Sequence, residues 1–168
     1  MLKLPALVQG FYRGWDPSFA GSTLNALAQG RGPEAIGEGT FFSCYPLRAA
    51  DPRDLKTVLL LAKPSFYRQG PRYLEAWRQA MLRMRSLEHP LLPPFELLES
   101  PKGQVAYGMP YLAQALGSEA QRHPSFDRQR CELEALFAAK GLHLGDLWQF
   151  RLWQGQPLLC DFSDLTLV

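Results

Sequence analysis

Two carboxylates near the end of the sequence are the first residues whose types and spacing are suited to chemistry. Asp146 and Asp161 bracket a stretch that alternates like a strand, turns at Gln154-Gly155 and alternates again. A turn of this kind joins the two strands of a hairpin, so the carboxylates are expected at its two ends. Because carboxylates hold hard metal ions and accept protons, we interpret the pair as part of a binding site.

Composition, net charge and cysteine spacing limit the classes of protein to which the chain can belong. The 168 residues are 46% hydrophobic, which suffices for one core or two small lobes, and the net charge is +2. So small a charge gives no bulk attraction to nucleic acid. The three cysteines have no metal-ligand spacing, and an odd count without a secretion signal is typical of a reducing compartment. No apolar run is long enough for a membrane span. We therefore expect a soluble, cytoplasmic protein.

Two strand pairs are predicted ahead of the carboxylates. Residues 39–47 and 56–63 are rich in apolar and aromatic residues and flank an Asp51-Pro52 turn, so they are expected to form a hairpin. Residues 95–99 and 104–109 flank a second turn and predict a second pair.

Two helices are predicted between and after these strands. One opens at Pro71 and carries an apolar stripe; the other has Ser125 as its N-cap and ends at Gly141. Residues 112–122 are expected to be a short helix or linker, and residues 1–35 an irregular lead-in with one helical turn at most. The order of elements indicates an α+β fold in two lobes.

Six stretches in this order resemble the eukaryotic-type protein kinase-like superfamily, which includes small-molecule and lipopolysaccharide kinases. They are similar to the glycine-rich loop, the strand of the phosphate-contacting lysine, the stretch after the regulatory helix, the hinge, the catalytic loop and the metal-binding Asp-Phe-Gly segment. In that order they read IGEGTFFSCY, VLLLAK, MRSLEHPLLPPFELLES, QVAYGMPYL, GDLWQFRL and LLCDFSDL. The resemblance implies an antiparallel N-lobe with one helix over residues 36–112 and a minimal C-lobe over residues 113–168.

The resemblance also implies roles in binding ATP and Mg²⁺. Gly37 and Gly39 would let the backbone approach phosphates, and Lys63 would hold the α- and β-phosphates. Asp161 would hold Mg²⁺, and Asp146 would orient an attacking hydroxyl and accept its proton. Each residue also has an ordinary reading. The glycines can be turn residues, the lysine can face water, and the aspartates can cap or turn the chain.

At the hinge, the resemblance implies that the Pro110 carbonyl accepts from adenine and the Leu112 N–H donates to it. Two nearby motifs depart from the family pattern. Phe42 stands at the third glycine position, where its ring would cover or fill the phosphate site. Leu144 stands where the family has a histidine, two residues before the catalytic aspartate.

The metal and ion-pair positions depart as well. Arg151 replaces the metal-binding asparagine, and an arginine cannot ligate a cation; it would pair with Asp161 or touch phosphate instead. Glu75 is the nearest carboxylate to the one that should pair with Lys63, about one turn early. No activation segment follows Ser163, so we expect a protein partner or a second copy of the chain to cover this part of the C-lobe.

Three functions remain open from the sequence. We favour a pseudokinase, a binding or regulatory module that keeps a nucleotide-type cleft. The first alternative is a minimal active ATP-dependent phosphotransferase, because Lys63, Asp146 and Asp161 are all present. The second is a structural protein whose motifs are coincidental.

Overall fold

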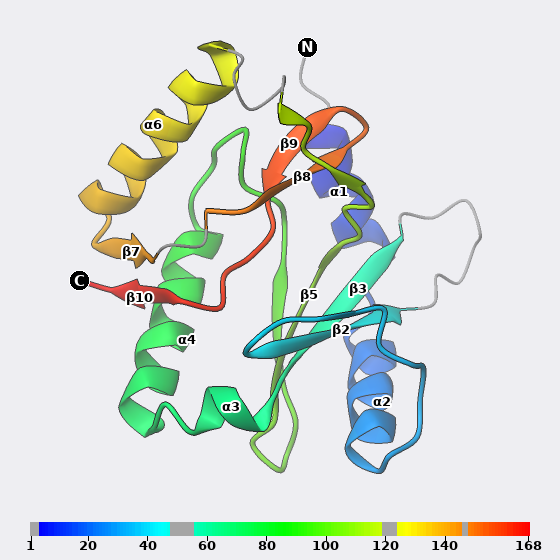
Figure 1. Ribbon diagram of the computed structural model, residues 1–168. Coiled ribbons are helices and arrows are strands. Elements are labelled where there is room, and N and C mark those ends of the chain that lie inside the picture. The colour runs from blue at the N-terminus through cyan, green and yellow to red at the C-terminus, as the bar shows by residue number, and fades with distance from the viewer. Residues whose placement is uncertain (1–3, 48–55, 119–123, 146–147) are drawn as a thin grey trace. The chain divides into compact units, whose positions relative to one another are not determined.

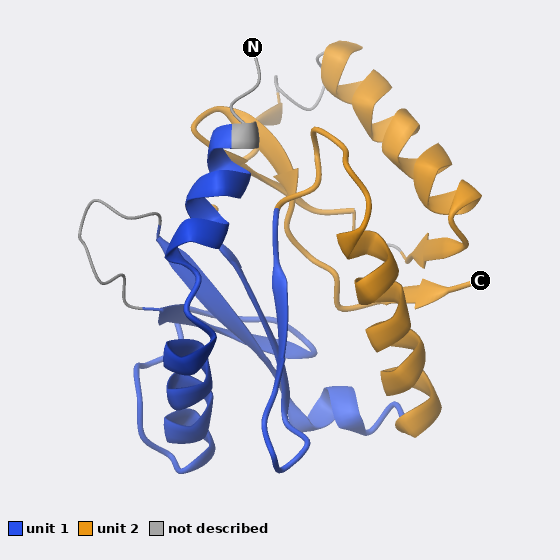
Figure 2. Ribbon diagram, turned by 180° about the vertical axis from the view of Figure 1, so that it is seen from behind, with its two compact units in different colours: residues 1–70, 94–111 blue, residues 71–93, 112–168 orange. Residues whose placement is uncertain are grey.

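The computed structural model describes residues 4–47, 56–118, 124–145 and 148–168. The chain forms two compact units, each discontinuous in sequence (Figure 2). Unit 1 comprises Met1–Gly70 and Pro94–Tyr111, and unit 2 comprises Pro71–Pro93 and Leu112–Val168. The helix that opens at Pro71 therefore groups with the C-terminal residues, whereas the sequence-based division had placed it within residues 36–112.

Unit 1 is built on a five-stranded antiparallel sheet (Figure 1). Its strand order is β1-β2-β3-β5-β4, and each neighbouring pair is antiparallel. Both predicted strand pairs are confirmed, as β2 with β3 and as β4 with β5; the turn at Asp51-Pro52 lies outside the described residues. The strands are β1 Gly37–Glu38, β2 Phe42–Leu47, β3 Thr57–Ala62, β4 Glu96–Glu99 and β5 Val105–Pro110.

The predicted irregular lead-in is wrong, because two helices precede the sheet: α1, Leu4–Gly14, and α2, Pro17–Ala28. The start of α2 is fixed by Asp16, whose Oδ1 accepts from the N–H groups of Ser18 at 3.0 Å and Phe19 at 3.2 Å. Ala20 and Leu24 are buried in a common cluster with residues of the sheet. This cap and this burial outweigh the low helix propensity of the glycine, serine and asparagine residues that suggested a loop.

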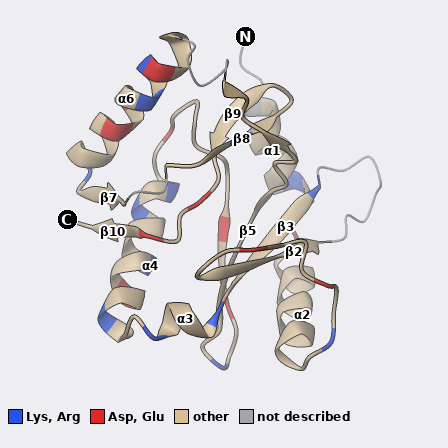
Figure 3. Cartoon of the chain, in the orientation of Figure 1, with Lys and Arg blue, Asp and Glu red and all other residues tan. Residues whose placement is uncertain are grey.

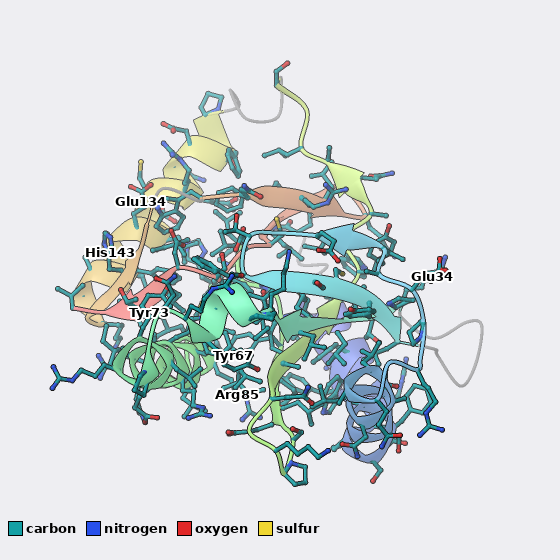
Figure 4. All side chains as sticks on the ribbon, turned by 60° about the horizontal axis from the view of Figure 1, so that its bottom comes forward. Glu34, Tyr67, Tyr73, Arg85, Glu134 and His143 are labelled. Atoms are coloured by element: carbon teal, nitrogen blue, oxygen red, sulfur yellow. The ribbon has the colours of Figure 1, made fainter. Side chains whose placement is uncertain are left out.

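A short helix, α3, Pro64–Tyr67, follows β3 and closes one end of the sheet core. Phe66 is fully buried, and its ring centroid lies 4.9 Å from that of Phe42. The hydroxyl of Tyr67 accepts a 2.9 Å hydrogen bond from the N–H of Val105 (Tyr67 is labelled in Figure 4). The residues after Lys63 are thus held on the sheet by an aromatic contact and by a hydrogen bond.

Unit 2 holds two long helices, α4, Pro71–Arg85, and α6, Pro124–Ala139. The apolar stripe predicted for α4 is confirmed, since Trp77, Met81 and Met84 are buried. Helix α6 begins at Pro124, a residue suited to the first helical position, so Ser125 lies within the helix and the prediction of Ser125 as N-cap is wrong.

Short strands complete unit 2. Strands β7, Leu142–Leu144, and β10, Leu165–Leu167, form one pair; β6, Gln114–Ala115, β8, Phe150–Trp153, and β9, Gln156–Leu159, form a three-stranded sheet. The predicted hairpin is confirmed as β8 and β9, with positive φ at Gln154 and Gly155. Of the two alternatives predicted for residues 112–122, the helix is wrong at β6, because pairing with β8 fixes an extended backbone there, and residues 119–122 lie outside the described residues.

Candidate functional site

The glycine-rich stretch forms a tight antiparallel turn in unit 1. Gly37 lies opposite Cys44 in the β1–β2 pair, and the N–H of Gly39 donates to the carbonyl of Phe42 at 2.8 Å. The side chain of Phe42 is 5% exposed and packs on Phe66. The bulky residue at the third glycine position therefore fills the core of unit 1.

Lys63 is bound to this turn. Its Nζ lies 3.0 Å from Glu38 Oε2 and donates to the carbonyl of Gly39, also at 3.0 Å. Glu38 Oε1 accepts from the Ser43 hydroxyl at 3.2 Å. The hydrogen bond and the positive charge of Lys63, with the Ser43 hydroxyl, lower the pKa of Glu38 against a small opposing effect of desolvation. The lysine that would meet phosphate thus has a carboxylate and a carbonyl as its present partners.

Glu38 is a residue that the sequence analysis missed. It lies between the two glycines and opposite Ser43, which is itself paired with Leu61 near the end of β3. A carboxylate in the first of three successive strands, with a lysine directly after the third, was the available signal. Glu75, the candidate considered from sequence, bonds to its own helix instead, accepting from Gln79 at 2.9 Å and Arg78 at 3.4 Å.

The hinge-like segment runs from the end of β5 into unit 2. Pro110 is the last residue of β5 and lies opposite Thr57, and the N–H of Tyr111 donates to the carbonyl of Lys56 at 2.8 Å. Leu112 is 4% exposed. The backbone at both predicted adenine-contacting residues is therefore well fixed.

Arg151 on β8 holds the chain just after this segment. Its Nε donates to the carbonyl of Leu112 at 2.7 Å, and its Nη2 donates to the carbonyl of Ala113 at 2.9 Å. The guanidinium thus bonds two successive carbonyls through its fork of donors. Within the part of the chain that the structure describes, Arg151 bonds to these carbonyls and forms no ion pair with Asp161, so that alternative for Arg151 is wrong.

The Asp161-Phe162-Ser163 segment is folded into a tight turn. Asp161 Oδ1 accepts from the N–H of Ser163 at 2.9 Å and from its hydroxyl at 2.7 Å. Phe162 is fully buried, and its carbonyl accepts from the indole N–H of Trp77 at 2.9 Å. The carbonyl of Ser163 accepts from the hydroxyl of Tyr73 at 3.1 Å. The carboxylate predicted to hold a metal is therefore held by its own turn, and that turn by α4.

The catalytic-loop candidate, Asp146, lies outside the described residues. Its neighbours show that the flanking strand is packed: Leu144 is 4% exposed in β7, and His143 is exposed and pairs with Thr166. In the described ranges, no three His, Cys, Asp or Glu side chains gather closely enough to hold a metal ion.

A cavity of about 520 Å³ lies within unit 2, with Arg151 and Cys160 among its lining residues. That volume lies in the range of small-molecule sites. Burial and the charge of Asp161 raise the pKa of the Cys160 thiol, on its wall, to about 11. The cavity is lined by Ala115, Leu116, Phe126, Asp127, Arg130, Trp148, Gln149, Phe150, Arg151 and Cys160.

Solved structures share the fold of this chain. Three mutant forms of the kinase domain of PknI from Mycobacterium tuberculosis match with TM-scores of 0.59, 0.58 and 0.59 at 16%, 16% and 15% identity. The chain has a protein-kinase-like fold. The match covers 77% or 78% of this kinase-like chain and only 57% or 58% of those kinase domains. No protein-family model matches the sequence, and no curated protein does.

The kinase-like fold confirms the fold that the six sequence stretches implied. Among helices of the described residues, none combines the length and apolar character needed to cross a bilayer.

Proposed function

We propose that this kinase-like protein is a pseudokinase that acts as a binding or regulatory module in the cytoplasm. The observation that carries the proposal is the pair of hydrogen bonds made by the Arg151 side chain. A guanidinium stands where the family resemblance implies a metal-ligating asparagine, and it bonds the carbonyls of Leu112 and Ala113. A cation site at this position would need an oxygen ligand, which arginine does not supply.

Lys63 and Glu38 support the same proposal. A phosphate that approached the glycine-rich turn would meet the carboxylate of Glu38 as well as the ammonium of Lys63. The carboxylate competes for the lysine and repels the phosphate charge. A nucleotide bound by Gly37, Gly39, Lys63, Pro110 and Leu112 would therefore bind weakly, and without a requirement for Mg²⁺.

The partner that we propose is a protein or a second copy of this chain, not a nucleic acid. Acidic and basic residues lie along α6 together (Figure 3). The basic residues Arg128 and Arg130 face carboxylates one turn away, at Glu132, Asp127 and Glu134. This leaves α6 without the continuous basic stripe on which phosphate backbones bind.

Thermal unfolding with ATP or ADP, each with Mg²⁺ or with EDTA, tests the nucleotide part of the proposal. A ligand at one hundred times its dissociation constant stabilises a protein by about 2.7 kcal/mol, a shift of several degrees for a domain of this size. We expect either no shift or a shift that persists in EDTA and is lost in Lys63→Ala. Arg72→Ala, which removes an exposed arginine of α4, is the charge-matched control.

The alternative, a minimal phosphotransferase, is favoured by one observation. Asp161 uses Oδ1 for both bonds to Ser163, and its Oδ2 makes no hydrogen bond within the described residues. That oxygen is suited to a metal ion. A thermal shift that requires Mg²⁺, together with phosphate transfer that is abolished in Asp161→Asn, would replace the pseudokinase proposal by this one.

A further inference from the structure

Two aromatic side chains of α4 donate to consecutive carbonyls of the Asp161-Phe162-Ser163 turn. Tyr73 and Trp77 are four residues apart, so they lie on the same face of the helix. Trp77 donates to the carbonyl of Phe162 at 2.9 Å, and Tyr73 donates to the next carbonyl along, that of Ser163, at 3.1 Å. Figure 4 shows Tyr73 reaching from α4 to the C-terminal segment.

The bond from Trp77 is buried, and the bond from Tyr73 is partly buried. Trp77 and Phe162 are fully buried, and a buried indole N–H without an acceptor is unfavourable. Burial, together with the charge of Asp164, raises the pKa of Tyr73, so its hydroxyl remains a donor into the alkaline range. The two bonds therefore hold the two successive peptide groups on either side of the Ser163 Cα atom.

The fixed backbone in turn restricts the carboxylate. Ser163 donates to Asp161 Oδ1 through its N–H at 2.9 Å and its hydroxyl at 2.7 Å. The hydroxyl bond exists only because a serine stands where the family resemblance implies glycine. The chain of contacts runs from α4 through two carbonyls to one oxygen of Asp161.

We propose that Tyr73 and Trp77 are positioning residues that hold the Asp161 carboxylate in one orientation. They join α4 and residues 161–163 into one rigid body. The grouping of Pro71–Pro93 with Leu112–Val168 in unit 2 agrees with this. Helix α4 cannot shift along or away from this segment without losing one buried and one partly buried hydrogen bond. The importance of Asp161 as a ligand-binding residue rests on the proposed function, but its restriction by α4 does not.

Hydrogen exchange and scalar couplings of the whole chain, measured by NMR without added ligand, test this proposal. In Tyr73→Phe, which removes one hydroxyl, and in Trp77→Phe, the amides of Ser163 and Leu165 should exchange about tenfold faster. The Leu165 N–H reports on the same turn because it donates to the carbonyl of Phe162. The Hα–Hβ couplings of Asp161 should change from single-rotamer to averaged values, which loss of packing elsewhere would not produce.

Tyr67→Phe is the matched control, since it removes a hydroxyl that bonds a backbone group in unit 1. It should loosen the amide of Val105 and leave Ser163 unchanged. The Lys140 amide, which directly follows α6 and donates to the carbonyl of Leu136, separates local from global effects and should keep its protection in every variant.

Unchanged exchange at Ser163 in Tyr73→Phe would overturn the proposal, as would unchanged Asp161 couplings. So would a loss of protection of equal size at Ser163 and Lys140, because the effect would then be general destabilisation. If Trp77→Phe does not fold, Tyr73→Phe alone decides. Because no nucleotide is used, failure here and failure of nucleotide binding are separate results.

Discussion

The ammonium of Lys63 and the carboxylate of Glu38 lie 3.0 Å apart, the lysine at the end of β3 and the glutamate in β1. Both side chains are partly exposed, at 31% and 59%. A pair of this kind contributes little to stability, and its importance lies in what the lysine is free to bind. The glycine-rich turn thus provides the counterion that a bound phosphate would otherwise provide.

Glu38→Gln should strengthen the binding of an anion to Lys63. The change removes a competing negative charge and keeps the shape of the side chain, so we expect affinity for ADP in EDTA to rise by about two- to fivefold. Isothermal titration calorimetry measures this. Glu75→Gln, which alters a carboxylate bonded only within α4 among the described residues, should leave affinity unchanged. Equal effects of the two variants would mean that net charge alone is responsible.

The pair should also make a small, pH-dependent contribution to stability. Because Lys63 lowers the pKa of Glu38 below its ordinary value of 4.5, the contribution is fully present above pH 4.5. It is lost as pH falls through the lowered pKa of the folded state. Urea unfolding of the parent and of Glu38→Gln should therefore differ at pH 6 and converge at the acid end, and a difference that grows below pH 4 would contradict the assignment.

Arg151→Lys should destabilise the protein although it preserves the charge. Lysine carries its donors on a single nitrogen and lacks the planar fork whose Nε and Nη2 reach the carbonyls of Leu112 and Ala113, so one or both bonds are lost. We expect a loss of about 1–2 kcal/mol in the free energy of unfolding, measured by denaturant titration. Arg128→Lys, at an exposed ion pair on α6, should change stability by less than about 0.5 kcal/mol.

The three thiols should differ sharply in reactivity. Burial raises the pKa of Cys44 and of Cys160 to about 11, whereas Cys131 is exposed. A disulfide reagent at pH 8 should thus label Cys131 quickly and the two half-buried thiols much more slowly. Cys131→Ser should abolish the fast phase, and a fast phase that survives would contradict the burial of the other two.

The same two thiols predict a loss of stability in alkali. A raised pKa in the folded state favours folding below the ordinary value of 9.0, and the contribution disappears as pH rises from 9 through about 11. Thermal midpoints measured between pH 8 and 11 should fall for the parent and fall less for Cys44→Ala, which has no thiol to ionise at this half-buried position.

Two glycine-to-alanine substitutions should change the free energy of unfolding in opposite directions. A Cβ at Gly108 in β5 would overlap the indole ring of Trp15, so Gly108→Ala should cost about 1–3 kcal/mol and alter tryptophan fluorescence. A Cβ at Gly21 in α2 meets no atom within 4 Å, so Gly21→Ala should stabilise by about 0.5–1 kcal/mol. The two variants are compared by their denaturant midpoints. If Gly21→Ala also destabilised the protein, the open surroundings of Gly21 in α2 would be contradicted.

The sequence was informative where local pattern and burial agree. The apolar run before Lys63 and the stripe on α4 predicted β3 and α4, because a buried strand and an amphipathic helix need just those patterns. It failed at α2, where small residues form a helix because Asp16 caps it and the sheet covers Ala20 and Leu24.

The candidate site was predictable only in part. The order of motifs implied the kinase-like fold, but the partners of Lys63 and Arg151 depend on strand register and on backbone carbonyls, which carry no side-chain signal. Glu38 pairs with Lys63 because β1 and β3 both flank β2, and Arg151 bonds carbonyls because β6 pairs with β8. The roles proposed for Gly37, Gly39, Pro110 and Leu112 stay predictions, as does that of Asp146, which lies outside the described residues.

The pairing of β3 with β5 determines when the sheet of unit 1 can be completed during synthesis. The chain leaves unit 1 at Gly70 and returns at Pro94, so the central strand pair joins residues on either side of an excursion through α4. On a ribosome, the β2–β3 hairpin can form early, but its exposed edge must wait for β5 to emerge. The vulnerable nascent chain is therefore one with β3 finished and β5 not yet made, and a holding chaperone would act in that interval.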